Sequence, residues 1–192
     1  QCPKCGGKLE VVYDPLPKAK NLSDLVNPSK PGLWKYWRLL PVSNVERALS
    51  LGEGDTFLHE CNILAKAQGL SKIWIKDEGK NPTGSFKDRN AAVSVTKALE
   101  FGASKVAIAS DANAGPAVAA YSAKAKLPCY VFMPSTTEPT RLAQAMVFGA
   151  RVIRIEGEGL VNDCIDIVEG LRPALGWHHL TTAGPVNPYQ LE

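Results

Sequence analysis

Hydrophobic residues in the second half of the chain fall in short continuous runs that alternate with longer amphipathic stretches. This pattern predicts strands at 105–110, 129–133, 151–155 and 177–180, and helices at 116–125, 137–148 and 160–171. Alternating strands and helices of this length indicate parallel strands joined by right-handed crossovers. Because the predicted strands are largely apolar, we expect helices on both faces of the sheet.

A strand, a turn and a helix are also predicted before this repeat. Residues 73–76 are β-rich, Pro82 and Gly84 mark a turn, and Ser85 is a suitable N-cap. The helical pattern that follows is carried by Phe86, Ala92, Val95 and Leu99. Gly102 and Gly149 stand where a C′ glycine should end a helix before the next strand.

Composition narrows the class of protein. The 192 residues are 45% hydrophobic and 21% charged, which is typical of a soluble globular protein. The net charge of +3, without a Lys or Arg cluster, argues against nucleic acid as a partner. No apolar run approaches membrane-spanning length, and the scattered cysteines favour a reducing, cytoplasmic setting.

Lys87 is the candidate reactive residue, because it falls in the first turn of a predicted helix. A cation is disfavoured at the positive end of a helix dipole, and burial would add to this effect. Both factors favour the neutral amine, which attacks an aldehyde to form a Schiff base. An ordinary solvated lysine at a helix start is the alternative.

The residues around Lys87 favour the reactive role. Residues 81–89, Asn-Pro-Thr-Gly-Ser-Phe-Lys-Asp-Arg, resemble the lysine motif of fold-type II enzymes that use pyridoxal 5′-phosphate (PLP), and more narrowly that of threonine synthases. Residues 51–56, Leu-Gly-Glu-Gly-Asp-Thr, resemble another motif of that family, with Phe57 in place of its proline. The resemblance implies a tryptophan synthase β-like α/β fold, with open, mostly parallel sheets and helices on both faces.

A second candidate element, Ser110 to Gly115, lies where a predicted strand gives way to a helix. Free backbone N–H groups at such a junction bind anions, and we expect a substrate carboxylate there. A simple Asx cap by Asn113 is the alternative. The resemblance implies that Lys87, Phe86 and Asn113 bind the cofactor, with Lys87 catalytic, and that Ser110, Asp111, Asn113 and Ala114 bind the substrate.

Several positions depart from the threonine synthase pattern. Ala112 replaces a glycine, and Asp111 replaces a Ser or Thr and so adds negative charge. Ala114, Pro185 and Gln190 replace residues that contact the substrate phosphate in the family. Loss of an Arg at position 190 removes a potentially bidentate charged contact. We therefore expect poor use of a phosphorylated substrate.

Cys2 and Cys5 have the C-x-x-C spacing of one zinc knuckle, which supplies two of the four ligands a structural zinc needs. Many threonine synthases carry an N-terminal zinc ribbon, so the resemblance implies a zinc ion in the full-length protein. The remaining cysteines, Cys61, Cys129 and Cys164, are expected to be small buried apolar residues. The three histidines have no motif around them.

The domain organisation we expect has four parts. Residues 1–14 form half of a zinc-ribbon-like knuckle with its strand, and 15–100 belong to a large PLP domain. Residues 101–185 form a smaller α/β domain, and 186–192 begin the return to the large domain. The proline-rich segment 15–50 is expected to wrap the surface. Both ends look cut, so we expect a fold incomplete at the C-terminus, inactive as this fragment alone and homodimeric when full length.

The resemblance implies a PLP-dependent lyase of amino-acid biosynthesis that acts on a small amino-acid substrate. In threonine synthase, O-phosphohomoserine gives threonine and phosphate by γ-elimination and β-addition of water. Two alternatives stay open. One is a related ammonia-lyase or dehydratase for an unphosphorylated amino acid, with Asp111 as a second base. The other is a diverged homologue without catalytic activity.

Overall fold

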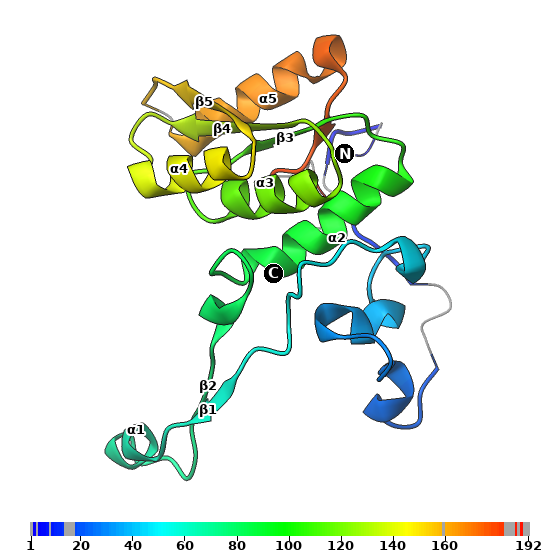
Figure 1. The fold of residues 1–192 in the computed structure, drawn as a ribbon, viewed down its shortest axis with the longest axis vertical. Coiled ribbons are helices and arrows are strands. Elements are labelled where there is room, and N and C mark those ends of the chain that lie inside the picture. Colours follow the sequence, from blue (N-terminus) through cyan, green and yellow to red (C-terminus); the bar gives the residue numbers. More distant parts are fainter. Residues whose placement is uncertain are drawn as a thin grey trace.

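A parallel four-stranded sheet is the centre of the protein. The structure, a computed structural model, describes residues 2, 4–7, 9–13, 18–158, 160–182, 187 and 189. The strand order is β5-β4-β3-β6, with all neighbouring pairs parallel (Figure 1). The strands are β3 (Val106–Ala109), β4 (Cys129–Pro134), β5 (Arg151–Ile155) and β6 (His178–His179). Each lies within or beside a run predicted from the sequence, and the predicted parallel arrangement is confirmed.

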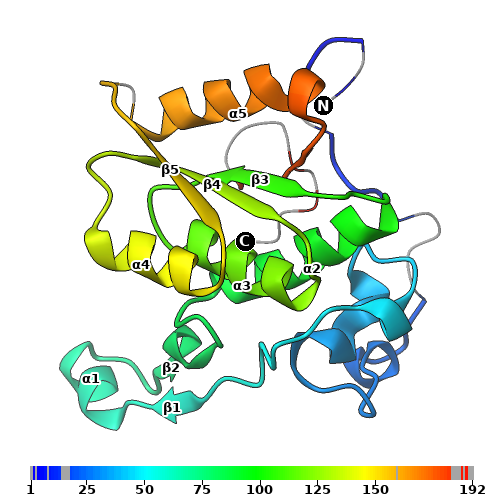
Figure 2. The same ribbon diagram turned by 45° about the horizontal axis from the view of Figure 1, so that its top comes forward.

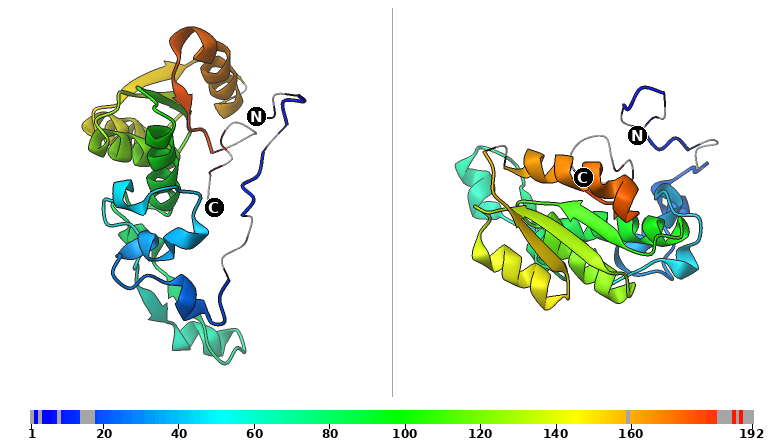
Figure 3. Two further views of the ribbon diagram at one scale, coloured as in Figure 1. Left: turned by 90° about the vertical axis from the view of Figure 1, so that its right-hand side faces the viewer. Right: turned by 90° about the horizontal axis from the view of Figure 1, so that it is seen from above.

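Helices cover both faces of this sheet, as the apolar strands predicted. Helices α2, α3 and α4 lie on one face and α5 lies on the other (Figures 2 and 3). Their bounds are α2 (Lys87–Glu100), α3 (Ala114–Lys124), α4 (Pro139–Val147) and α5 (Val161–Leu175). Within β3, Val106 and Ile108 join the core under α2 and α3, whereas Ala107 and Ala109 join the core under α5. The strand is therefore buried on both sides.

Helix α2 is buried over most of its circumference, which its sequence pattern did not predict. Ala92 and Val95 lie in the core, but Phe86 and Leu99, expected on the same apolar face, are exposed. The N-cap position is Phe86 rather than Ser85, although the Ser85 hydroxyl accepts a hydrogen bond from the Lys87 backbone N–H at 3.2 Å. Gly102 has φ of +72°, in agreement with its predicted role after the helix.

The proline-rich N-terminal segment contributes to the core and does not only wrap the surface. It forms three short 3₁₀ helices, η1 (Leu22–Leu25), η2 (Gly32–Leu39) and η3 (Val45–Arg47). Trp34 is buried in the same hydrophobic cluster as α2 and α3. Its indole N–H donates to the Leu49 carbonyl at 3.0 Å, and the Leu49 N–H donates to the Thr96 hydroxyl of α2 at 3.0 Å.

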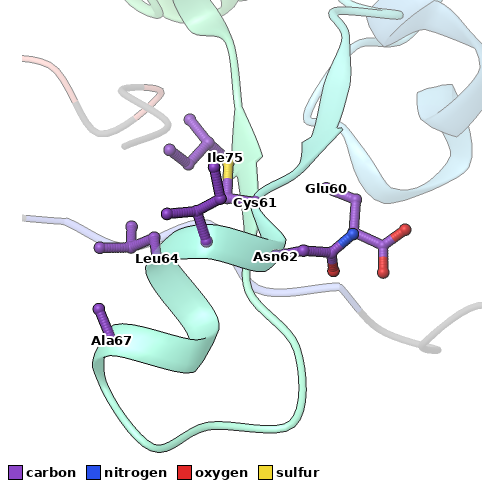
Figure 4. Close-up of a pocket in the computed structure, with 7 residues that line it drawn as sticks. Glu60, Cys61, Asn62, Leu64, Ala67 and Ile75 are labelled. Atoms are coloured by element: carbon purple, nitrogen blue, oxygen red, sulfur yellow. The ribbon is translucent and has the colours of Figure 1, made fainter.

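A small arm extends away from the sheet (Figure 1). It consists of β1 (Leu58–Glu60), α1 (Asn62–Ala67) and β2 (Trp74–Lys76), and β1 pairs antiparallel with β2. The strand at 73–76 was predicted, whereas β1 and α1 were not. Side chains of both strands are exposed, and Ile63 is 89% exposed. An open, largely apolar groove lies on the arm, between α1 and Ile75 (Figure 4).

The predicted division between residues 100 and 101 stays a prediction. Most of the segment 186–192 and several residues of 1–14 lie outside the described residues. In the part of the chain that the structure describes, none of the helices has the length and apolar character needed to cross a membrane.

Candidate cofactor site

Lys87, predicted in the first turn of a helix, is the first residue of α2, and it lies toward the carboxyl edge of the sheet. The other end of α2 marks the amino edge, because the ring of Phe101 lies 5.8 Å from that of His178, which pairs with the first residue of β3. A helix of 14 residues spans about 21 Å. The N-terminus of α2 is therefore at the edge where β3 leads into α3, and α2 packs beside α3 (Figure 1).

The turn before Lys87 is held by the residue after it. The Asp88 carboxylate accepts hydrogen bonds from the Thr83 backbone N–H at 3.0 Å and the Thr83 hydroxyl at 2.9 Å. Gly84 has φ of +82°, a conformation that disfavours other residues. The Gln144 side chain of α4 donates to the Thr83 carbonyl at 2.9 Å, which ties the turn to the α/β unit. This part of the motif therefore sets the local backbone.

Arg89 has a similar supporting role. Its guanidinium pairs in a bidentate manner with Glu78, at 2.7 and 2.8 Å, in the 3₁₀ helix η4 (Glu78–Lys80). The Arg89 hydrogen bond, followed by those from Thr56 and Asn81, lowers the pKa of Glu78 to about 2, although burial opposes the shift. The Asn81 side-chain oxygen also accepts from the Gly54 N–H at 3.0 Å. The Asp-Arg pair thus explains why the motif extends past the lysine.

Phe86 and Lys87 bring an aromatic ring and an amine side by side at the start of α2. Lys87 is half-buried, and its Nζ lies 4.6 Å from the centroid of the Phe86 ring. The Phe86 ring is 44% exposed. This arrangement can hold a flat aldehyde cofactor, because an amine lies beside an exposed aromatic ring on a turn that hydrogen bonds hold in place.

The Leu51–Thr56 segment is more than a flexible glycine turn. Gly52 and Gly54 both have positive φ, and a Cβ on Gly54 would lie 2.5 Å from the backbone nitrogen of Leu33. Glu53 between them is completely buried and accepts a hydrogen bond of 2.7 Å from the Tyr121 hydroxyl of α3. The sequence predicted a family motif in this segment but no role for Glu53.

The Ser110–Ala114 loop occupies the start of α3. The Ser110 hydroxyl accepts from the Gly115 N–H at 3.0 Å and from the Ala112 N–H at 3.3 Å. Asn113 is the N-cap residue, but its side chain makes no capping hydrogen bond. The Asx-cap alternative is therefore wrong. Within the described residues, the backbone N–H groups of Asn113 and Ala114 also make no hydrogen bond, which leaves two donors at a helix N-terminus.

The departures from the family pattern have different structural consequences. Ala112 does not have positive φ, so the absence of glycine there causes no backbone strain. Asp111 is exposed. Burial, followed by the charges of Asp163 and Asp111, raises the pKa of Cys164 to about 11. Ala114 is buried at the helix start. Pro185 and Gln190 lie outside the described residues.

The N-terminal cysteines form a tight turn. The Cys2 N–H donates to the Gly7 carbonyl at 2.9 Å, and the Gly6 N–H donates to the Cys2 carbonyl at 2.8 Å. Backbone N–H groups of Lys4 and Cys5 lower the pKa of the Cys2 thiol. Among the described residues there is no group of three or more His, Cys, Asp or Glu side chains that could hold a metal. The predicted zinc site is therefore not supported on this chain. Cys129 and Cys164 are buried as expected, whereas Cys61 is only half-buried.

Comparison with known proteins shows which protein family this sequence resembles. The model of the protein family described as "Pyridoxal-phosphate dependent enzyme" matches residues 49–192. A threonine synthase of Methanocaldococcus jannaschii is 39% identical over 98% of this chain and 46% of its own length. A threonine synthase of Methanosarcina acetivorans is 40% identical over 100% of this chain and 45% of its own length. The chain thus spans about half the length of these curated relatives.

Solved structures share the fold. Diaminopropionate ammonia lyase from Escherichia coli matches with a TM-score of 0.63 and 21% identity, covering 69% of this chain and 37% of that one. O-acetyl serine sulfhydrylase isoform 3 from Entamoeba histolytica matches with a TM-score of 0.60 and 24% identity, covering 67% and 40%. At these identities the likeness shows the fold alone, and that fold is the predicted fold-type II architecture. From its sequence match and its fold, this chain belongs to the pyridoxal-phosphate-dependent enzyme family.

Proposed function

We propose that the protein carrying this sequence is a PLP-dependent lyase of the threonine synthase type in amino-acid biosynthesis, with Lys87 as the residue that holds the cofactor. The observation that carries the proposal is the position of Lys87 as the first residue of α2, on a turn held by Asp88 and Arg89. The names of the two relatives at 39 and 40% identity support it.

The residues at the edge of the sheet fit this cofactor. The exposed Phe86 ring offers an apolar surface beside the Lys87 amine. The Asn113 carboxamide, which is not used as a cap, is available for the ring hydroxyl of the cofactor. The N–H groups of Asn113 and Ala114 suit the substrate carboxylate, because a helix N-terminus favours an anion.

The chemistry divides between cofactor and protein. When bound, PLP acts as an electron sink for charge that develops on the substrate. Lys87 then serves as a general base and acid that moves protons at the substrate carbons. Ser110 keeps the loop closed onto the helix start through the Ala112 and Gly115 N–H groups, so the donors that orient the substrate are held in place.

The substrate is a small amino acid. Conversion of O-phosphohomoserine to threonine and phosphate, by γ-elimination and β-addition of water, is the reaction of the threonine synthase type. Ala114 offers no hydroxyl and Asp111 places an exposed carboxylate in the same loop, so we propose that a phosphorylated substrate is used poorly. Phosphate would meet a negative charge where a neutral donor is expected.

A second candidate is an ammonia-lyase or dehydratase for an unphosphorylated amino acid. The exposed Asp111 carboxylate favours it, because a carboxylate in the substrate loop can act as a second base. A homologue without catalytic activity is the third candidate. A homodimer and a reducing, cytoplasmic setting stay predictions, the latter supported by five cysteines that are free.

The test of the cofactor role is reductive labelling of the full-length protein. Borohydride reduction of the PLP-loaded protein, followed by peptide mapping, should place the pyridoxyl group on Lys87. The label should disappear in Lys87→Ala and persist in Lys80→Ala, a nearby exposed lysine. A label on another lysine in the wild-type protein contradicts the assignment.

Substrate class is tested by the released product. Phosphate release from O-phosphohomoserine should be slow in the unmodified protein and should rise in an Asp111→Thr, Gln190→Arg double variant. Ammonia release from unphosphorylated amino acids, with little phosphate release, would select the second candidate. Rapid turnover of O-phosphohomoserine by the unmodified protein would refute the proposed effect of the replacements.

A further inference from the structure

Three polar side chains are joined by hydrogen bonds on the face of the sheet that α5 covers. Glu169 lies on α5, His179 is the last residue of β6, and Thr181 follows that strand. Glu169 Oε2 lies 2.9 Å from His179 Nδ1, and His179 Nε2 lies 2.5 Å from the Thr181 hydroxyl oxygen. His179 is 5% exposed and Thr181 is 1% exposed. Both ring nitrogens of His179 therefore have their partners inside the protein.

This triad of Glu169, His179 and Thr181 continues to the end of β3. The Ala109 backbone N–H donates to the Thr181 hydroxyl oxygen at 2.9 Å. Ala109 is the last residue of β3 and is 3% exposed, so its N–H needs an acceptor within the protein. The pairing of β3 with β6 ends at Ala107 and His179, so the Thr181 hydroxyl takes the place of a backbone acceptor beyond it.

The partners indicate where the protons lie. The Thr181 hydroxyl oxygen already accepts from the Ala109 N–H, so its own proton needs a separate acceptor. Among the described residues, His179 Nε2 is the acceptor within hydrogen-bond distance. The proton of the neutral imidazole is then on Nδ1, where it donates to the Glu169 carboxylate. In this arrangement every donor of the triad has an acceptor.

The charges around the imidazole favour this neutral state. Burial lowers the pKa of His179 and outweighs the hydrogen bond and charge of Glu169, which raise it; the charge of Arg172 lowers it further. Burial raises the pKa of Glu169, but the His179 hydrogen bond and the Arg172 charge outweigh it, so the pKa is lowered. Arg172 donates to the other carboxylate oxygen, Oε1, at 2.8 and 3.1 Å. Glu169 is therefore an ionised acceptor for His179.

A carboxylate, an imidazole and a hydroxyl in this order also form the triad of serine hydrolases. That role does not fit Thr181, because a nucleophile must reach a substrate and this hydroxyl is 1% exposed. Its oxygen is also occupied by the Ala109 N–H. The hydrogen bonds lead into the sheet, to the strand end that precedes the Ser110–Ala114 loop.

We propose that the triad of Glu169, neutral His179 and Thr181 positions the Ser110–Ala114 loop from the face of the sheet opposite to α3 (Figure 2). The Thr181 hydroxyl holds the last N–H of β3. The next residue, Ser110, accepts the two N–H groups that hold the loop on α3. The triad itself does not depend on the proposed function, whereas its effect on substrate binding rests on that function.

The first test is ¹⁵N NMR of the full-length protein with labelled histidine side chains, which distinguishes the two neutral tautomers from the imidazolium ion. At pH 7 the His179 ring, assigned through its backbone, should have its proton on Nδ1 and none on Nε2. A proton on Nε2, in the other tautomer or in the imidazolium ion, overturns the proposal. This measurement needs no variant, so it decides the matter even if a substitution prevents folding.

The second test is hydrogen–deuterium exchange in two variants. Thr181→Val keeps the shape of the side chain but removes the hydroxyl, whereas Thr181→Ser keeps a hydroxyl. In Thr181→Val the N–H groups of Ala109 and Gly115 should exchange about tenfold faster than in wild type, the size expected for one lost hydrogen bond. The Ser135 N–H, which donates to the Ile155 carbonyl at 2.8 Å, is the control and should not change. Thr181→Ser should restore slow exchange.

Each other outcome of the exchange experiment counts against the proposal. Unchanged exchange at Ala109 in Thr181→Val refutes the hydrogen bond from which the positioning starts. Faster exchange at Ala109 with unchanged exchange at Gly115 refutes the positioning of the loop. Faster exchange at all three N–H groups, including Ser135, shows a general loss of structure and contradicts a local role.

The effect on substrate binding is measured in the PLP-loaded full-length protein, with the substrate that the product-release assays select. Because the loop is proposed to hold the substrate carboxylate, Thr181→Val should raise KM several-fold with a smaller fall in kcat, and Thr181→Ser should stay near wild type. A lower kcat with unchanged KM contradicts the positioning role. If no substrate is found and borohydride places no label on Lys87, the proposed function fails, while the tautomer and the exchange rates still decide the triad.

Discussion

Tyr121→Phe removes the hydroxyl that donates to the buried Glu53 carboxylate and leaves the ring in place. Tyr121 is 0% exposed, and its hydroxyl donates at 2.7 Å to Glu53, which is also 0% exposed. The substitution creates no large cavity, so the effect isolates the hydrogen bond. The two donors that remain on the same carboxylate oxygen lie farther away, at 3.0 and 3.2 Å.

The expected loss follows from the charge of the acceptor. A hydrogen bond to a charged group contributes about 1.5–3 kcal/mol, more than a neutral one, and a buried acceptor has no water to replace the lost donor. Tyr121→Phe should therefore lower the free energy of unfolding by about 1.5–3 kcal/mol. That is about a tenfold to hundredfold change in the folding equilibrium, since about 1.4 kcal/mol corresponds to a factor of ten.

The assay is urea denaturation of the full-length protein, with the slope m checked for equality between variants. Tyr36→Phe is the matched control, because Tyr36 is 38% exposed and its hydroxyl makes no hydrogen bond to a described residue. It should change stability by less than about 0.5 kcal/mol. A double-mutant cycle with Glu53→Gln should give a coupling energy of at least about 1 kcal/mol. Equal effects of the two Tyr→Phe changes, or a coupling near zero, would refute the reasoning.

Two further predictions concern the loops around the lysine turn. Gly54→Ala should destabilise the protein more than Gly52→Ala: both positions have positive φ, but a Cβ at Gly54 would lie 2.5 Å from a backbone nitrogen, whereas one at Gly52 meets nothing within 4 Å. Thermal unfolding measures the difference, and equal losses would show that the close approach relaxes. Arg89→Ala should remove most of the stability that wild type loses as pH falls from about 4.5 toward 2, since the Glu78 carboxylate, with a folded pKa of about 2, contributes fully above its unfolded pKa and loses this contribution as pH falls toward the folded value. Unfolding free energies between about pH 2 and 6 test this, and equal slopes in both proteins would contradict it.

The alternation of strands and helices was readable from the sequence because it depends on local periodicity. Strand β5 begins and ends at the residues predicted for it, and β3 and β4 differ from their predicted ranges by a residue or two. The arm was predicted only in part, since its strands are exposed and β1 has just three residues. The role of Trp34 was missed, because a proline-rich segment carries no periodic signal for the helices it packs against.

The candidate site, like the fold, was predictable from the sequence only in part. The sequence determined that Lys87 lies in the first turn of a helix, since the turn residues before it and the helix formers after it are neighbours along the chain. It also located the Ser110–Ala114 loop at a strand-to-helix junction. Which of these side chains face outward and which are buried was decided by tertiary packing.

The hydrogen bonds of Glu53 and of the lysine turn depend on contacts between residues far apart in sequence. Glu53 meets Tyr121 across 68 positions, and Thr83 meets Gln144 across 61. A carboxylate in a glycine turn and a tyrosine in a helix each resemble exposed polar residues when read alone. Only the packing of α2 against α3 removes both from water, and burial in turn strengthens the hydrogen bond between them.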